Sequence, residues 1–170
     1  MKRKNNEFVI AFQGLALGTH LFKWQLNSAF FERLNIYDAP AGNFEVRLSL
    51  EKKSNLMDLK FDISGIINQL CDRCLQPVSV PIQSANTLIV KFGIETKEMT
   101  DEILILDENS HELKVDHYIY EFICLAIPRK IVHQNDQCDT EMTNLILDEQ
   151  PENTSESLDP RWDKLKNIKK

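Results

Sequence analysis

The sequence has 170 residues, 42% of them hydrophobic, so it is long enough for one domain with a sizeable core but not for two large ones. Its net charge of −6 argues against a general nucleic-acid coat protein, which would be basic. No apolar run reaches the ~20 residues that span a bilayer, and no apolar segment typical of a signal peptide follows the basic N-terminus. We therefore expect a cytoplasmic protein with no membrane partner, whose four cysteines are thiols or metal ligands rather than disulfides.

The first third of the chain is predicted to begin with strands. Residues 8–17 form an apolar run that predicts a first strand. Residues 20–26 alternate apolar and polar side chains, which is typical of a half-buried strand. Residues 27–33 then indicate a short helical turn, capped by Asn27 or Ser28.

The middle of the chain carries the clearest strand pattern. Residues 44–50 alternate apolar and charged or polar side chains, and residues 57–63 repeat the alternation after a hairpin turn. Gly65 indicates a β-bulge in the run that follows. Pro77 and Pro81 confine the start of the next strand to a sheet edge or a bulge, because proline cannot donate a ladder hydrogen bond.

The spacing of the apolar residues changes from a strand pattern to a helix pattern toward the C-terminus. Residues 95–112 are mostly polar and acidic, and only the apolar run at 103–106 indicates one more strand. From Asp116 onward the apolar residues recur at helical spacing, which predicts a helix over 116–127 with Asp116 as its N-cap. Pro128 is expected to end this helix.

Together these patterns predict an α+β fold that is mainly β. We expect an antiparallel sheet or barrel-like meander, with 44–50 paired to 57–63 and one helix packed on it, followed by a C-terminal helical tail. Deep burial is expected for Phe61, Ile63, Phe122 and Ile123. We divide the chain into a single β-rich domain (1–147), an acidic flexible linker (148–158) and a basic C-terminal helix (159–170).

The motif Cys71-Asp72-Arg73-Cys74 lies between two strand-like runs, so it should form a tight turn with both sulfurs on the same side. The nearest pair of further ligands is His133 and Cys138, which would complete a closed tetrahedral Cys₃His site for one structural zinc. Two other interpretations stay open, namely unliganded buried thiols and a redox pair. Cys124 falls within the apolar helix and is expected in the core.

No catalytic pattern is present in the sequence. The five glycines form no phosphate-binding cluster, and neither a nucleophile elbow nor a Cys-His-Asn order occurs. His117 and Glu121 are spaced one helical turn apart without a third ligand, which is typical of a solvated pair. We therefore expect a protein that is not an enzyme and has no small-molecule substrate.

The C-terminal third is strongly polarised in charge. Residues 131–160 contain Asp and Glu but no Lys or Arg and form an acidic stretch, whereas the last ten residues are basic. The segment can act as an arm that contacts phosphates while Trp162 stacks or anchors, or as a helix that docks on its own domain through Trp162 and Leu165. The candidate RNA or partner-binding residues are Arg73, Arg161, Trp162, Lys164, Lys166, Lys169 and Lys170.

The order and spacing of four segments resemble the YceD family, the large ribosomal RNA subunit accumulation proteins. These segments are Cys71-Asp72-Arg73-Cys74-Leu75, the run from Asp116 to Pro128, the pair His133 and Cys138, and Asp159-Pro160-Arg161-Trp162 with Leu165-Lys166. The resemblance covers residues 71–166, and the N-terminal half is similar only as a β-rich pattern. Carried over, the marked positions of the family are Cys71, Arg73, Cys74, Pro128, His133, Cys138 and, in some branches, the Asp-Pro-Arg segment.

The resemblance implies a non-enzymatic bacterial ribosome-biogenesis factor that supports the synthesis, processing or stability of large-subunit (23S) ribosomal RNA. Its partners would be ribosomal RNA or a large-subunit ribosomal protein. An alternative is an adaptor whose acidic stretch binds a basic ribosomal protein without touching RNA. Some relatives carry further cysteines after the helix, whereas residues 139–157 have none, which leaves His133 as the fourth ligand.

Overall fold

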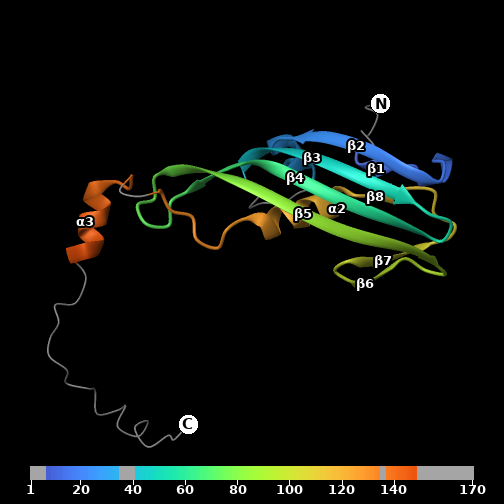
Figure 1. Cartoon of the computed structure of the whole chain (residues 1–170). Helices are drawn as coiled ribbons and strands as arrows, with labels where there is room; N and C mark the ends of the chain where they lie inside the picture. The colour runs from blue at the N-terminus through green and yellow to red at the C-terminus, as the bar shows by residue number, and fades with distance from the viewer. Residues whose placement is uncertain (1–6, 35–40, 135–136, 149–170) are drawn as a thin grey trace, which may run out of the picture.

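The computed structural model describes residues 7–34, 41–134 and 137–148 (Figure 1). The elements, in chain order, are β1 (Val9–Ile10), a 3-10 helix (Phe12–Gly14), β2 (Gly18–Leu26), α1 (Ser28–Arg33), β3 (Ala41–Lys52), β4 (Leu56–Leu70), β5 (Pro77–Gly93), β6 (Lys97–Thr100), β7 (Ile103–Asp107), β8 (Leu113–Lys114), α2 (Asp116–Ala126) and α3 (Thr140–Asp148). Apart from Asp148, the predicted linker (148–158) and basic helix (159–170) lie outside the described residues, so the division of the chain stays a prediction.

The described residues form an α+β fold that is mainly β, as predicted. Six strands make one open sheet in the order β2-β3-β4-β5-β7-β6, and β1 pairs with β8 in a small separate ladder. The predicted pairing of 44–50 with 57–63 is confirmed, with Val46 opposite Ile63 and Leu50 opposite Leu59. Of the two expected arrangements, the sheet is open and not a barrel. One pairing differs from an antiparallel sheet, since β7 lies between β5 and the edge strand β6 and pairs with β5 in parallel.

The core lies between the sheet and α2. Alternate residues of β3 and β4 point to this side, and Phe61 and Ile63 are each 1% exposed. From α2, Ile123 is fully buried and Phe122 places its ring 5.2 Å from that of Phe61. The predicted deep burial of these four residues is confirmed. The opposite side of the sheet carries the polar and charged residues of the same strands.

The structure corrects three local predictions, on the first strand, the start of α2 and the burial of Cys124, and confirms the cap of α1. Within the predicted strand 8–17, only Val9–Ile10 pair as a strand, because the chain turns into the 3-10 helix at Phe12. The predicted cap of α1 is confirmed, since the Asn27 Oδ1 accepts from the Ala29 N–H at 3.1 Å. In α2 the N-cap position belongs to Val115, and Asp116 is the first helical residue. Cys124 is half-buried rather than part of the core.

Gly65 does not form a bulge, because β4 pairs in continuous register with both β3 and β5 through this position. A Cβ at Gly65 would lie 2.6 Å from the Phe44 Cδ1 and would also clash with the Asn43 carbonyl oxygen. The glycine therefore gives space both to the β3 backbone at Asn43 and to the Phe44 ring, which is 1% exposed.

One end of β4 and β5, with the turn that joins them, forms an arm, defined as residues 66–81, and its last two residue pairs extend beyond β3 (Figure 1). The pairing of β3 with β4 ends at Ala41 and Asn68, whereas β4 and β5 remain paired to Leu70 and Pro77. On its other side β5 pairs with β7 only from Ile89 onward, so its first twelve residues form an edge. This agrees with the predicted edge position of the two prolines.

Candidate metal centre

The arm ends in the turn that carries Cys71 and Cys74. The Cys71 N–H donates to the Gln76 carbonyl at 2.9 Å, and the Leu75 N–H donates to the Cys71 carbonyl at 2.9 Å. These bonds close the turn and set both cysteine side chains on its inner side, where they are at most 1% exposed. Leu75 has φ of 57°, a left-handed conformation that is unusual for a leucine.

A second segment reaches the arm tip after α2. Ile127 leaves the helical conformation before Pro128, and the chain continues to Ile131 beside the turn. Asp72 binds this segment through both the carbonyl and the N–H of Ile131. The Asp72 N–H donates to the Ile131 carbonyl at 2.7 Å, and the Ile131 N–H donates to the Asp72 carboxylate at 2.6 Å. This clamp brings His133 and Cys138 to the cysteine turn.

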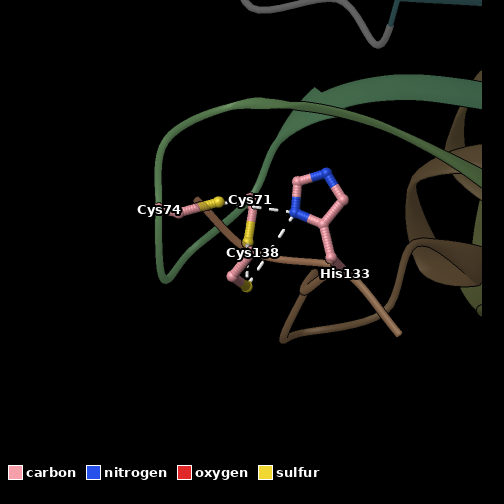
Figure 2. A group of neighbouring side chains, drawn as sticks. All are labelled: Cys71, Cys74, His133 and Cys138. Carbon is pink, nitrogen blue, oxygen red and sulfur yellow. Dashed lines mark hydrogen bonds between the residues drawn. The ribbon is translucent and has the colours of Figure 1, made fainter. Parts of the chain in front are cut away.

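Figure 2 shows the four side chains converging from these two segments. The Cys71 and Cys138 sulfurs are 3.9 Å apart. The His133 Nδ1 lies 3.4 Å from the Cys74 sulfur and 4.0 Å from the Cys138 sulfur. All four potential ligand atoms lie within 4.8 Å of one another. Two Zn–S bonds of ~2.3 Å at a tetrahedral angle place two sulfurs ~3.8 Å apart, so this spacing fits a tetrahedral zinc site.

The imidazole of His133 has the orientation of a metal ligand. Its Nε2 lies 3.1 Å from the Pro77 carbonyl oxygen, which can only accept a hydrogen bond. The proton is therefore placed on Nε2, and the lone pair of Nδ1 faces the sulfurs. A hydrogen bond from the second ring nitrogen to a backbone carbonyl is the usual support of a metal-bound histidine.

The surroundings of the thiols favour the thiolate at two of them. Burial disfavours the Cys71 thiolate, but the backbone N–H groups of Cys74, Arg73 and His133 outweigh it and lower the pKa of Cys71 to about 5. Burial also acts against the Cys74 thiolate, and the N–H groups of Gln76 and Asp139 outweigh it to lower its pKa. Thiolates are the form that binds metal.

The other two groups respond to these negative charges. Burial, together with the neighbouring Cys71 and Cys74, raises the pKa of Cys138. The Cys71 sulfur raises the pKa of His133. The Arg73 guanidinium lies 4.0 Å from the Cys138 sulfur and adds a positive charge at the tip. A divalent cation would take the place of the protons on Cys138 and His133 and would neutralise the negative charge of the thiolates. The donor set therefore fits zinc in its chemistry as well as in its distances.

Some contributors to the site had a sequence signal and others had none. The structure brings together all four predicted ligands, and it places Arg73 at the tip with an exposed side chain. Sequence analysis missed the clamp by Asp72, although its position inside the C-x-x-C motif was a signal. It also missed the acceptor role of the Pro77 carbonyl, because every residue has a backbone carbonyl and the sequence does not indicate which one will accept a given hydrogen bond.

The helix α3 follows the site directly and was not predicted. Asp139 caps it, since its Oδ1 accepts from the N–H groups of Glu141 at 2.9 Å and Met142 at 3.2 Å. Met142 also packs against the buried cysteines. The other predicted binding residues lie outside the described residues, and the roles of all of them stay predictions. These are Arg161, Trp162, Lys164, Lys166, Lys169 and Lys170.

Comparison with known families agrees with the resemblance of the sequence motifs. A family model described as "Large ribosomal RNA subunit accumulation protein YceD" matches residues 59–169. No curated protein and no solved structure matches the chain. Among the described residues, no helix is long and apolar enough to cross a membrane. The family match covers more than half of the 170 residues, so the chain belongs to the YceD family.

Proposed function

We propose that this member of the YceD family acts as a non-enzymatic factor that supports the synthesis, processing or stability of large-subunit ribosomal RNA in the bacterial cytoplasm. The observation that carries the proposal is the family match, which spans the arm, the cysteine site and the basic C-terminal segment together. The family description names RNA accumulation and no catalytic activity. The partners would be ribosomal RNA or a large-subunit ribosomal protein.

The second part of the proposal is one structural zinc, held by Cys71, Cys74, His133 and Cys138. Four protein ligands would fill a tetrahedral site and leave no open position for a substrate. The ion would hold the 131–138 segment against the arm tip, in addition to the Asp72 clamp. Support comes from the 3.9 Å separation of the Cys71 and Cys138 sulfurs and from the 3.1 Å contact between the His133 Nε2 and the Pro77 carbonyl oxygen.

The third part assigns RNA contact to Arg73 and the basic tail. Arg73 is exposed at the arm tip, close to the site where the described chain continues into α3. Beyond α3 the sequence carries Arg161, Lys164, Lys166, Lys169 and Lys170 around Trp162. Cations of this kind would bind phosphate oxygens, and an indole ring can stack on a base.

The test is binding to large-subunit ribosomal RNA fragments at two salt concentrations, with the full chain and with residues 158–170 deleted. Each neutralised phosphate on a single strand contributes a slope of about −0.7 in log K against log salt. We therefore expect weaker binding and a shallower salt slope after deletion. Unchanged affinity and slope, together with a lower melting temperature, would instead identify the tail as a helix that docks on its own domain.

A second candidate function is an acidic adaptor for a basic ribosomal protein. It is favoured by the edge of the sheet at β6, where all four residues are exposed. Within residues 95–112 the exposed acidic side chains are Glu95, Glu98, Asp101, Glu102, Glu108 and Glu112, against the single cation Lys97. Such a surface attracts a basic partner. A pull-down treated with nuclease separates the two functions, because an adaptor retains its ribosomal protein and an RNA-bound factor loses it.

A further inference from the structure

The arm differs from the rest of the molecule in having almost no charge. Residues 63–71 and 74–90 contain no Asp, Glu, Lys or Arg, although 27% of the whole chain is charged. The outer side of β2 and β3, by contrast, carries Lys23, Glu45 and Arg47 in a network of ion pairs. A surface without cations has little to offer the phosphates of RNA, so the arm is suited to another kind of partner.

The uncharged surface also exposes large apolar side chains. Ile66 is 52% exposed, Leu70 is 57% exposed and Leu75 is 61% exposed. On the neighbouring strand, Pro81 lies opposite Ile66 and Pro77 lies opposite Leu70, and both prolines are exposed. These five residues, with Asn68 and Ser79 between them, are named the arm face.

Leu75 adds an argument from backbone strain. Its φ of 57° is a conformation that glycine or asparagine adopts at lower cost than leucine. The side chain does not offset this cost by burial within its own domain, since it is 61% exposed. The backbone of Leu75 closes the cysteine turn, but its side chain makes no buried contact within the domain and is available for a contact outside it.

The pattern of the arm face is symmetric along the strands. An apolar pair, Ile66 and Pro81, is followed by the polar pair Asn68 and Ser79 and then by the apolar pair Leu70 and Pro77. The polar pair is joined by a hydrogen bond of 2.8 Å from the Ser79 hydroxyl to the Asn68 Oδ1. A two-fold axis through this pair, lying in the plane of the face and across the strands, places apolar pairs on apolar pairs and amides on amides. The arm face is therefore complementary to itself.

The shape beside the arm face fits the same arrangement. A hollow of about 660 Å³ is lined by Asn43, Ser64, Ile66, Asn68 and Ser79, among others, with Glu45 at its β3 side. Leu70 follows Asn68 on the same side of β4 and is exposed. A surface with both projecting side chains and a hollow can pair with a second copy of itself. Electrostatics restricts where this happens, because two chains of net charge −6 repel each other except across an uncharged area.

We propose that the arm face binds the arm face of a second copy of this chain, forming a two-fold symmetric dimer. The arm face has seven residues, fewer than the roughly 20–30 residues a side of a standard stable interface, so the dimer should be weak and dependent on concentration. The inference does not rest on the proposed function, because it uses only the described residues of the arm. Arg73, the exposed cation at the tip, is not one of the arm-face residues.

The test is the molar mass of the purified full chain, measured by sedimentation equilibrium from about 1 µM to about 100 µM. We expect the mass to rise from that of a monomer toward that of a dimer. Leu70→Lys should lower the association constant at least tenfold, because the dimer would then bury an unpaired ammonium group. Leu21→Lys is the matched control, since Leu21 is 79% exposed on β2 and outside the arm face.

Leu75→Asn is a second variant, chosen because it is expected to fold normally. Asparagine tolerates the left-handed conformation, so this variant should keep the melting temperature while weakening the dimer. A chain that stays monomeric over the whole concentration range overturns the proposal. So does a dimer that survives both Leu70→Lys and Leu75→Asn, because another surface would then form it.

Discussion

Two buried clusters of this protein consist of different kinds of side chain. The larger cluster joins aromatic and aliphatic side chains from the sheet, α1 and α2, including Phe31, Phe44 and Phe61. The smaller cluster, at the arm tip, consists of Cys71, Cys74 and Cys138, and only Val78, Val132 and Met142 pack against it in part. Both clusters exclude water, but only the first has enough apolar surface to be stable by burial alone.

The magnitudes explain the difference. A buried leucine or phenylalanine contributes ~1.5–3 kcal/mol, and the larger cluster contains many such residues. Three thiols contribute far less apolar area, whereas the apparent binding free energy of a structural zinc is ~10–16 kcal/mol. The sheet core is therefore expected to fold without a ligand, and the arm tip to depend on one. The following predictions test this contrast, beginning with the largest expected effect.

The first prediction concerns the sheet core. Phe61→Ala should lower the free energy of unfolding by ~3–5 kcal/mol, because Phe61 is 1% exposed and its loss leaves a cavity against Phe122. Urea denaturation followed by circular dichroism measures the change. Leu21→Ala is the control and should cost less than ~0.5 kcal/mol, since Leu21 is 79% exposed. Equal effects of the two variants would contradict the described core.

The second prediction concerns the arm tip. Protein purified without chelator should contain about one zinc per chain, and Cys71→Ser should abolish it. Cys124→Ser should retain the zinc, because Cys124 lies outside the cluster of ligands. Metal removal should accelerate amide exchange at 71–76 and 131–134 while the exchange of β3 and β4 stays slow.

Two outcomes of the metal experiment would contradict the contrast between the clusters. If chelation unfolds the whole domain, the sheet core depends on the metal as well. If no metal copurifies, or if exchange at the arm tip is unchanged by its removal, the cysteines are packed thiols or a redox pair. Disulfide mapping of the protein under oxidising conditions then separates these two interpretations.

The third prediction concerns the point where the arm leaves the sheet. Gly65→Ala should lower the free energy of unfolding by ~1–3 kcal/mol, because the added Cβ would lie 2.6 Å from the Phe44 Cδ1. Gly14→Ala is matched to it and should have little effect, since no atom lies within 4 Å of a Cβ there. Thermal denaturation of both variants measures the difference. A stable Gly65→Ala variant would show that both the Phe44 ring and the β3 backbone at Asn43 can shift.

The smallest expected effect lies on the outer, charged side of the sheet. Lys23, and then Arg47, hold the Glu45 carboxylate and lower its pKa to about 2. Because the folded pKa is depressed, the stabilising contribution is complete above the ordinary glutamate pKa of 4.5 and is lost as the pH falls toward 2. Carboxyl titration by NMR should show this shift, and it should diminish at high salt.

Lys23→Gln provides the control for the titration of Glu45. It removes the partner at 2.9 Å and should raise the pKa of Glu45 toward the usual range. The melting temperature should change little, because exposed ion pairs contribute little to stability. An unchanged pKa in this variant would assign the shift to Arg47 alone.

The sequence by itself determined the parts of this protein that depend on local spacing. The alternation over 44–50 and 57–63 fixed which residues face the core, since a strand places every second side chain on the same side. The helical spacing after Asp116 located α2, and Pro128 located its end. The four potential metal ligands were also found from residue type and spacing, because a tetrahedral site needs few donors of limited chemistry.

Only the tertiary structure decided the features that depend on distant partners. The parallel pairing of β5 with β7 follows from the position of β6 at the edge, and no local pattern contains it. Gly65 resembled a bulge in the sequence, whereas its role is to leave space for the Phe44 ring on a neighbouring strand. The Asp72 clamp joins residues 59 positions apart, and the self-complementary arm face arises from the register of β4 against β5. Each of these is a contact between segments that the sequence separates, so its geometry exists only after the chain has folded.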